Sequence, residues 1–206
     1  MTHMKAINAS MYSDLSFLKD NTVALTGTYT GVTTATAQGL IDAIMDDRVT
    51  DTQVATACAE FFQTKANYQA NCIRIKDIRE FPAMGTPPNI VNVPVYGQKT
   101  SQQIQGQADA PSLEIQINYV ADEWQDAAGK LGSIVGNGEV YIFRFTMMSS
   151  DPLTYDGDAI KAEPNTEFYF LAKLEAMQVT PQLTDANTCT LTLSLQSDFY
   201  GPATLS

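Results

Sequence analysis

Two groups of acidic side chains come closest to a pattern that could do chemistry. Asp151, Asp156 and Asp158 surround Gly157, and oxygen ligands of this kind can bind Ca²⁺. Their spacing differs from that of an EF-hand, so we interpret this stretch as an acidic turn. The acidic residues within 122–126 could form an acid/base pair, but carboxylates are expected in the first turn of a helix because of its dipole. We therefore predict no metal site and no catalytic carboxylate.

Histidine and cysteine, which supply many nucleophiles, bases and metal ligands, are scarce. His3 is the sole histidine, which excludes most His-based triads and His-metal sites. Cys58, Cys72 and Cys189 are an odd number without a C-x-x-C pair, so neither a disulfide framework nor a zinc site is indicated. Signatures such as G-x-S-x-G, the P-loop and H-E-x-x-H are also missing. We expect a protein that is not an enzyme and binds no cofactor.

The net charge of -11 comes almost entirely from the second half of the chain. Residues 109–206 hold 14 acidic and 4 basic side chains, whereas residues 1–108 hold 9 and 8. A DNA-binding protein needs a basic surface to neutralise phosphates, so we expect no specific DNA binding by the second half. Its acidity could repel DNA, or it could simply keep the protein soluble.

Residues 71–80 alternate in a way that predicts a strand with an exposed, charged face. Arg74, Lys76 and Arg79 form a small basic cluster there. The cluster is too small for a nucleic-acid site, so we expect a solvated face or a patch that meets an acidic neighbour. An earlier strand is predicted at residues 22–31, where Val23, Leu25 and Tyr29 alternate with Thr and Gly.

Two helices are predicted in the first half of the chain. From Thr34 onward, apolar residues recur on one helical face, formed by Ala37, Leu40, Ile41, Ile44 and Met45. A second helix should begin at Thr50, which stands in a capping-box arrangement with Gln53. Its apolar face holds Cys58 together with Val54, Phe61 and Phe62. We interpret Cys58 as a small buried hydrophobe rather than a nucleophile.

The run from Ile90 to Val120 predicts a hairpin of two extended segments with a turn at Gly106, Asp109 and Pro111. In the second segment one face is apolar, formed by Leu113, Ile115, Ile117 and Tyr119. The other face is hydrophilic, formed by Glu114, Gln116 and Asn118.

The first segment of this run is rich in amides. Five of the ten positions from Gln98 to Gln107 are Gln, and Ile104 alone is strongly apolar, so a core cannot hold such a strand. Its backbone groups need another strand beside them. We consider two interpretations, an assembly surface and an ordinary exposed edge strand.

Strands dominate the chain from Val91 onward. A helix is expected around Trp124, capped by Asp122, and three further strands are predicted at about residues 140–148, 168–174 and 190–196. With 206 residues, the chain can form one domain that buries roughly 70% of its unfolded surface. We find neither a signal peptide nor an apolar run of about 18 residues, and we expect a soluble protein.

The stretch V-P-V-Y-G-Q-K-T-S-Q-Q-I-Q-G-Q-A-D-A-P-S-L-E-I-Q-I-N-Y-V, followed by the Trp124 helix and three strands, resembles the major tail tube protein of long-tailed, non-contractile (siphovirus) bacteriophages. The likeness covers about residues 90–206. It implies a mainly β fold, an antiparallel β-sandwich or barrel of the phage tail tube type with a flanking α-helix. Residues 90–206 would be the β core of a single domain, and residues 31–89 a partly helical insertion or a long inter-ring loop.

The resemblance also implies a function. Such subunits form hexameric rings that stack into a tube for genome delivery. The partners would be further copies of the chain, the tape measure, tail tip and tail terminator proteins, and viral DNA passing without specific binding. The protein would belong to the virion tail, assembled in the host cytoplasm, with no membrane insertion.

On this hypothesis we assign three sets of residues. The lumen would be lined by Glu114, Gln116 and Asn118. Contacts between subunits would involve Gln98, Thr100, Gln102 and Gln103. Contacts between rings would involve Arg74, Lys76 and Arg79. Two other hypotheses are a β-sandwich module of a virion that binds a glycan or a surface, and a hydrolase that uses two carboxylates.

Overall fold

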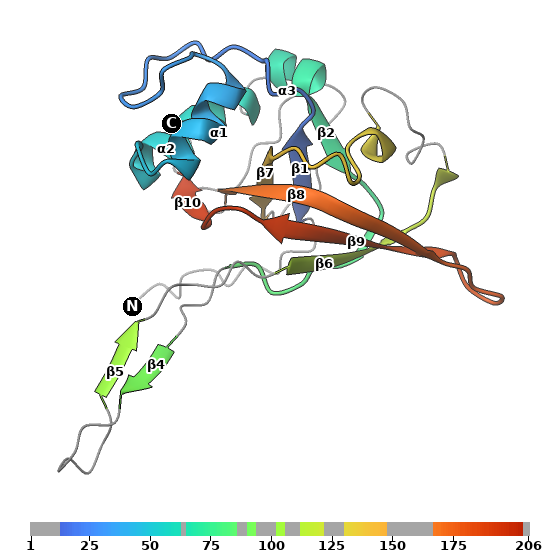
Figure 1. Cartoon of the computed structure of the whole chain (residues 1–206). Coiled ribbons are helices and arrows are strands. Elements are labelled where there is room, and N and C mark those ends of the chain that lie inside the picture. Colours follow the sequence, from blue (N-terminus) through green and yellow to red (C-terminus); the bar gives the residue numbers. More distant parts are fainter. Residues whose placement is uncertain are drawn as a thin grey trace, which may run out of the picture.

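The computed structural model describes residues 13–62, 65–85, 90–93, 102–105, 112–121, 130–147 and 167–203. They form an antiparallel eight-stranded sheet, three helices over part of one face, and a separate two-stranded ladder (Figure 1). The strands of the large sheet are β1 (Asp14–Leu18), β2 (Cys72–Ile75), β3 (Ile78–Glu80), β6 (Ser112–Asn118), β7 (Tyr141–Thr146), β8 (Glu167–Thr180), β9 (Thr188–Leu195) and β10 (Tyr200–Ala203). The expected mainly β fold is confirmed.

The large sheet curls so that its two ends approach each other. The strand order is β2-β1-β7-β8-β9-β6-β3, with β10 pairing β8 beside this path. Although β2 and β3 stand at opposite ends of the order, only Lys76 and Asp77 separate them in the chain. Three peptide steps span at most about 11 Å, so the ends of the sheet meet at this corner. Asp77 turns the chain with a φ of 60°.

The inner face of the curled sheet carries the larger apolar cluster. Alternate residues of each strand point into it, as Tyr141, Phe143 and Phe145 of β7 do. Phe143 stacks on Phe170, with ring centroids 5.4 Å apart. Residues from both ends of the strand order contribute, since Ile75 of β2 is buried in the cluster and Ile78 of β3 packs against it, as the curling requires.

Three helices cover the outer face of β1, β7 and the first part of β8. They are α1 (Ala37–Met45), α2 (Asp51–Phe62) and α3 (Lys65–Asn71). Both helices predicted from periodicity are confirmed, and the Thr50 amide donates to Gln53 Oε1 at 3.1 Å as the capping box requires. A second apolar cluster, the outer apolar cluster, lies between these helices and the sheet, and Cys58 is 1% exposed within it.

The strand predicted at residues 22–31 is wrong. Within it the described backbone forms only an isolated bridge between Ala24 and Thr36, and the strand lies earlier, at β1. All five residues of β1 are buried between β2 and β7, including the polar residues Asp14 and Ser16 that alternate with Leu15 and Phe17. The single strand predicted at residues 71–80 is divided into β2 and β3 at Lys76 and Asp77.

The prediction that the two segments within residues 90–120 pair with each other as a hairpin is wrong. The amide-rich strand β5 (Gln102–Gln105) pairs with β4 (Ile90–Val93), and β6 pairs with β9 and β3. The apolar face of β6 belongs to the core of the large sheet, to which an amide-rich strand adds little. In Figure 1 the β4–β5 ladder lies apart from that sheet.

The β core also begins earlier than expected. β1, β2 and β3 precede residue 90 and belong to the same sheet as the later strands, so residues 90–206 are not the whole core. Residues 122–129, where most of the helix around Trp124 is expected, lie outside the described residues, and so does the acidic turn at Asp151, Asp156 and Asp158.

Candidate assembly surfaces and a buried ion-pair network

Strand register gathers polar side chains in two rows on the outer face of the sheet, beneath the helices. In one row Asp14 of β1 lies beside Thr146 of β7, which lies beside Glu167 of β8. In the next row the neighbours are Arg74 of β2, Ser16 of β1, Arg144 of β7 and Tyr169 of β8. Diagonal neighbours between the two rows therefore bring acidic and basic groups together.

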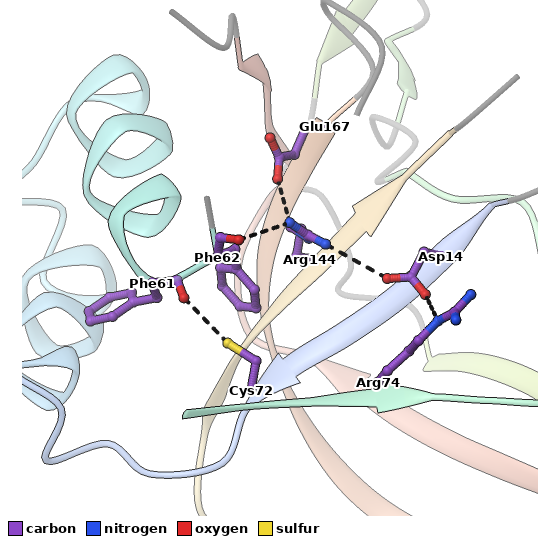
Figure 2. A network of polar contacts seen from close by, with 7 residues as sticks. All are labelled: Asp14, Phe61, Phe62, Cys72, Arg74, Arg144 and Glu167. Carbon is purple, nitrogen blue, oxygen red and sulfur yellow. Dashed lines mark hydrogen bonds and ion pairs between the residues drawn. The ribbon is translucent and has the colours of Figure 1, made fainter. Parts of the chain in front are cut away.

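These diagonals form a buried ion-pair network, which we define as Asp14, Arg74, Arg144 and Glu167 (Figure 2). Arg144 Nη1 donates to Glu167 Oε1 at 3.1 Å, and Arg144 Nη2 lies 3.8 Å from Asp14 Oδ2. Asp14 Oδ1 also accepts a hydrogen bond from Arg74 Nε. Arg144 is 0% exposed, and Asp14 and Glu167 are each 1% exposed.

The network also holds the end of helix α2 against the sheet. Arg144 Nη1 lies 3.4 Å from the Phe62 carbonyl oxygen, and Cys72 Sγ lies 3.4 Å from that of Phe61. The guanidinium of Arg144 lies 5.3 Å from the ring centroid of Phe62 and 5.2 Å from that of Tyr68. Arg144 thus neutralises two carboxylates, satisfies a helix-end carbonyl and stacks on two rings.

Burial affects the two partners of the central pair differently. It raises the pKa of Glu167, and the opposing charge of Arg144 reverses only part of that effect. Burial alone would lower the pKa of Arg144, but Glu167 and Asp14 raise it above the ordinary value, so the guanidinium stays charged. Since these groups have almost no solvent exposure, we interpret the network as structural rather than catalytic.

The sequence reasoning did not single out Arg144, Asp14 or Glu167. A signal for Arg144 was present, because it interrupts the apolar run V-Y-I-F-R-F-T in the strand predicted at about residues 140–148. A charge in such a strand must have a partner, since an unpaired buried charge is very costly. The identity of the partners depends on strand register, which the sequence does not state.

The residues assigned to the lumen lie on β6, with the predicted faces. Leu113, Ile115 and Ile117 are buried, whereas Glu114 and Gln116 are exposed. Asn118 is half-buried, and its backbone N–H donates to the backbone carbonyl of Asp77 at 2.9 Å. Across the ladder with β9, the outward neighbours are Thr192 beside Glu114 and Thr190 beside Gln116. The outer surface here is hydrophilic, and its place in a lumen remains a prediction.

The residues assigned to subunit contacts are only partly described. Gln102 and Gln103 lie in β5, opposite Val93 and Asn92 of β4, whereas Gln98 and Thr100 fall outside the described residues. Among the described strands, β4 and β5 pair with each other alone. The backbone of this ladder therefore presents two edges that the described strands leave unpaired.

The three residues of the basic cluster lie at the corner where the two ends of the curled sheet meet. Arg74 is in β2 and Arg79 in β3, at opposite ends of the strand order, with Lys76 between them. Arg74 pairs with Asp14, and Arg79 Nη2 lies 3.2 Å from Asp185 Oδ2. Arg74 and Arg79 are thus engaged within the chain, and the proposed inter-ring role remains a prediction.

Comparison with known proteins adds no relative. No protein-family model matches the chain, and no curated protein matches it. Within the described ranges, no helix is long and apolar enough to cross a membrane. The same residues include no group of three or more His, Cys, Asp and Glu side chains that could hold a metal ion.

Proposed function

We propose that the chain is a structural subunit that assembles with copies of itself into stacked hexameric rings and forms the tail tube of a long-tailed, non-contractile bacteriophage. The observation that carries this proposal is the β4–β5 ladder, which pairs with none of the other described strands. Two-stranded ladders are marginally stable in water, and three or more strands are needed for independent stability. A neighbouring subunit would supply the additional strands.

Ring formation meets this need through symmetry. An unpaired strand edge is a template for pairing with another chain, and a closed ring gives every copy the same neighbour. The register that opposes Gln103 to Asn92 would then extend into the neighbouring subunit through main-chain hydrogen bonds. Pairing through the backbone explains how an amide-rich strand can be retained without an apolar core.

The outer face of β6 suits the interior of such a tube. Glu114 and Gln116 are exposed there, and their cross-strand neighbours Thr192 and Thr190 are half-buried. Phosphate contacts would slow the passage of DNA, and an acidic or neutral polar surface provides few of them. The tape measure, tail tip and tail terminator proteins would be the further partners, and the virion tail the location.

Electron microscopy of the purified full chain tests the proposal. We expect rings with a central hole, or tubes, at high protein concentration. Gln103→Pro should abolish them because proline removes a backbone donor from β5. Gln103→Ala is the matched control, since it keeps that donor and should still assemble. A parent protein that stays monomeric at high concentration, even with the tail initiator present, would overturn the proposal.

A further inference from the structure

A second polar cluster lies on the helical layer, away from the ion-pair network. The Glu60 carboxylate of α2 faces the loop before α1 and accepts hydrogen bonds from three of its residues. Oε2 accepts from the Thr26 amide at 2.8 Å and from Thr26 Oγ1 at 2.7 Å, and Oε1 accepts from the Gly27 amide at 3.0 Å and from the Tyr29 hydroxyl. Four donors from one loop thus converge on a single carboxylate.

The loop is shaped to admit this carboxylate. A Cβ atom added at Gly27 would lie 2.5 Å from Glu60 Oε1 and 2.9 Å from the Tyr29 ring. Any side chain at position 27 would therefore displace the carboxylate or the phenol. Two adjacent backbone N–H groups aimed at one anion form a small anion-binding concavity, to which the two hydroxyls add.

We propose that Thr26, Gly27 and Tyr29 form a carboxylate-binding loop that Glu60 fills, and that this contact is a clasp which opens when the carboxylate is protonated. The clasp holds residues that help cover the outer apolar cluster. Leu25 is 7% exposed within that cluster, and Val23, Tyr29 and Val32 pack against it. Opening would therefore uncover apolar surface over α1 and α2. The proposal does not depend on self-assembly.

Few of the ionisable groups around the clasp can account for its sensitivity to acid. Burial alone would raise the pKa of Glu60, but the hydrogen bonds from Tyr29, Thr26 and Gly27 lower it below the ordinary value. Burial raises the pKa of Tyr29 and of Cys58, so neither ionises in acid. Arg48 Nη1 donates to the Gly31 carbonyl at 2.9 Å and Arg48 Nη2 lies 3.1 Å from Asp46 Oδ2, which ties Asp46 to this loop. Asp20 lies in the loop itself, where hydrogen bonds from the Thr22 amide and hydroxyl lower its pKa.

The sign of the pH effect follows from the lowered pKa of Glu60. A carboxylate whose pKa is lower in the folded state stabilises that state above its unfolded pKa, about 4.3 for glutamate, and the stabilisation is lost as pH falls through the folded pKa. The clasp is therefore closed at neutral pH and opens in acid.

Amide hydrogen exchange of Thr26 and Gly27 in the full chain, followed by NMR, tests the clasp. At neutral pH we expect Glu60→Gln to speed both amides by about ten- to a hundredfold, since hydrogen bonds to a charged group are worth about 1.5–3 kcal/mol. Asp46→Asn is the matched control and should leave both rates within about twofold. The ratio of variant to parent rates should approach one as the parent is acidified below the pKa of Glu60. Equal rates in parent and Glu60→Gln at neutral pH would overturn the proposal.

Chemical rescue separates the binding loop from general destabilisation. In Glu60→Ala, sodium formate should slow the exchange of Thr26 and Gly27 again, whereas sodium chloride at the same ionic strength should not. In the double variant Glu60→Ala/Gly27→Ala, formate should have no effect, because the added Cβ occupies the carboxylate position. Identical responses to formate and chloride in Glu60→Ala would show that the loop does not bind carboxylates.

Discussion

Strand β7 displays the two faces of the curled sheet within six residues. Tyr141, Phe143 and Phe145 enter the inner cluster, where the packing is apolar and aromatic and the Tyr141 hydroxyl accepts a hydrogen bond from Asn137 Nδ2 at 2.7 Å. On the outer face Ile142 packs beneath the helices, whereas Arg144 occupies the ion-pair network. Both faces are buried, but the inner one is stabilised by non-directional burial of area and the outer one also by directional pairing.

The difference predicts different responses to substitution. An apolar core tolerates changes that conserve volume, and it is disrupted most by a charge. The outer network contains charges already, so the cost of a change there depends on which partner remains. Removing a cation leaves buried carboxylates uncompensated, whereas neutralising one carboxylate relieves part of the desolvation penalty.

The largest effect is expected for a charge on the inner face. Ile115 of β6 is 0% exposed within the inner cluster, so Ile115→Asp buries a carboxylate without a partner. The penalty is comparable with the whole net stability of a domain, about 5–15 kcal/mol, and should prevent folding. Soluble yield and far-UV circular dichroism measure this. A folded, assembling Ile115→Asp protein would mean that the two faces of β6 are reversed.

A smaller but still large effect is expected for Arg144→Met. The variant keeps the length of the side chain but leaves Glu167 without its cation, which should lower the free energy of unfolding by about 3–5 kcal/mol. Urea titration measures the change. The double variant Arg144→Met/Glu167→Gln should regain part of the loss, because no uncompensated carboxylate then remains at Glu167. Equal stability of the single and double variants would refute the charge-pairing account.

Glu167→Gln alone should change stability modestly, by about 1 kcal/mol, and in a way that depends on pH. Burial raises the pKa of Glu167 in the folded protein, so its ionisation opposes folding. The contribution of Glu167 to stability is therefore largest below its unfolded pKa and declines as pH rises through the folded pKa. Relative to the parent, Glu167→Gln should become more stable as pH rises above the unfolded pKa, about 4.3 for glutamate. Urea titrations of both proteins at several pH values would detect the trend, and the opposite slope would contradict it.

The smallest effect is expected on the exposed part of the outer face, beyond the helices. Glu114 neighbours the mutated position Ile115 along β6 but points to solvent. Glu114→Gln should change the free energy of unfolding by no more than about 0.5 kcal/mol. Thermal and urea unfolding of Glu114→Gln and of the parent measure the change. A loss above about 1 kcal/mol would show that Glu114 makes stabilising contacts with other protein groups rather than with solvent alone.

Local patterns predicted the elements that have one buried and one exposed face. The apolar faces of α1 and α2, the capping box at Thr50 and the alternation of β6 appear in the structure, except that Met45 at the end of α1 is 54% exposed. Each depends on the spacing of neighbouring residues, which the sequence states directly. Strand β1 was missed although Asp14 and Ser16 alternate with Leu15 and Phe17, because so short a segment with polar side chains on one face does not by itself indicate a strand that is buried on both faces.

Features that join distant residues could not be predicted in this way. The partners of β5 and β6 were wrong because an alternating pattern identifies the face of a strand without naming its neighbour. Likewise, Arg74 and Arg79 are close in the sequence, but β2 and β3 pair with different strands, so the two side chains meet different carboxylates, Asp14 and Asp185.

The amino-acid sequence by itself determined which side of each amphipathic helix and of β6 would be buried, because burial of apolar side chains follows their local period. The tertiary structure decided which strands pair and which charges meet. Arg74 reaches Asp14 across 60 positions, and Arg144 meets Glu167 across 23, only because register places them diagonally on adjacent strands. Ion pairs and hydrogen bonds are short-range and directional, so their formation depends on distances that only the folded chain defines.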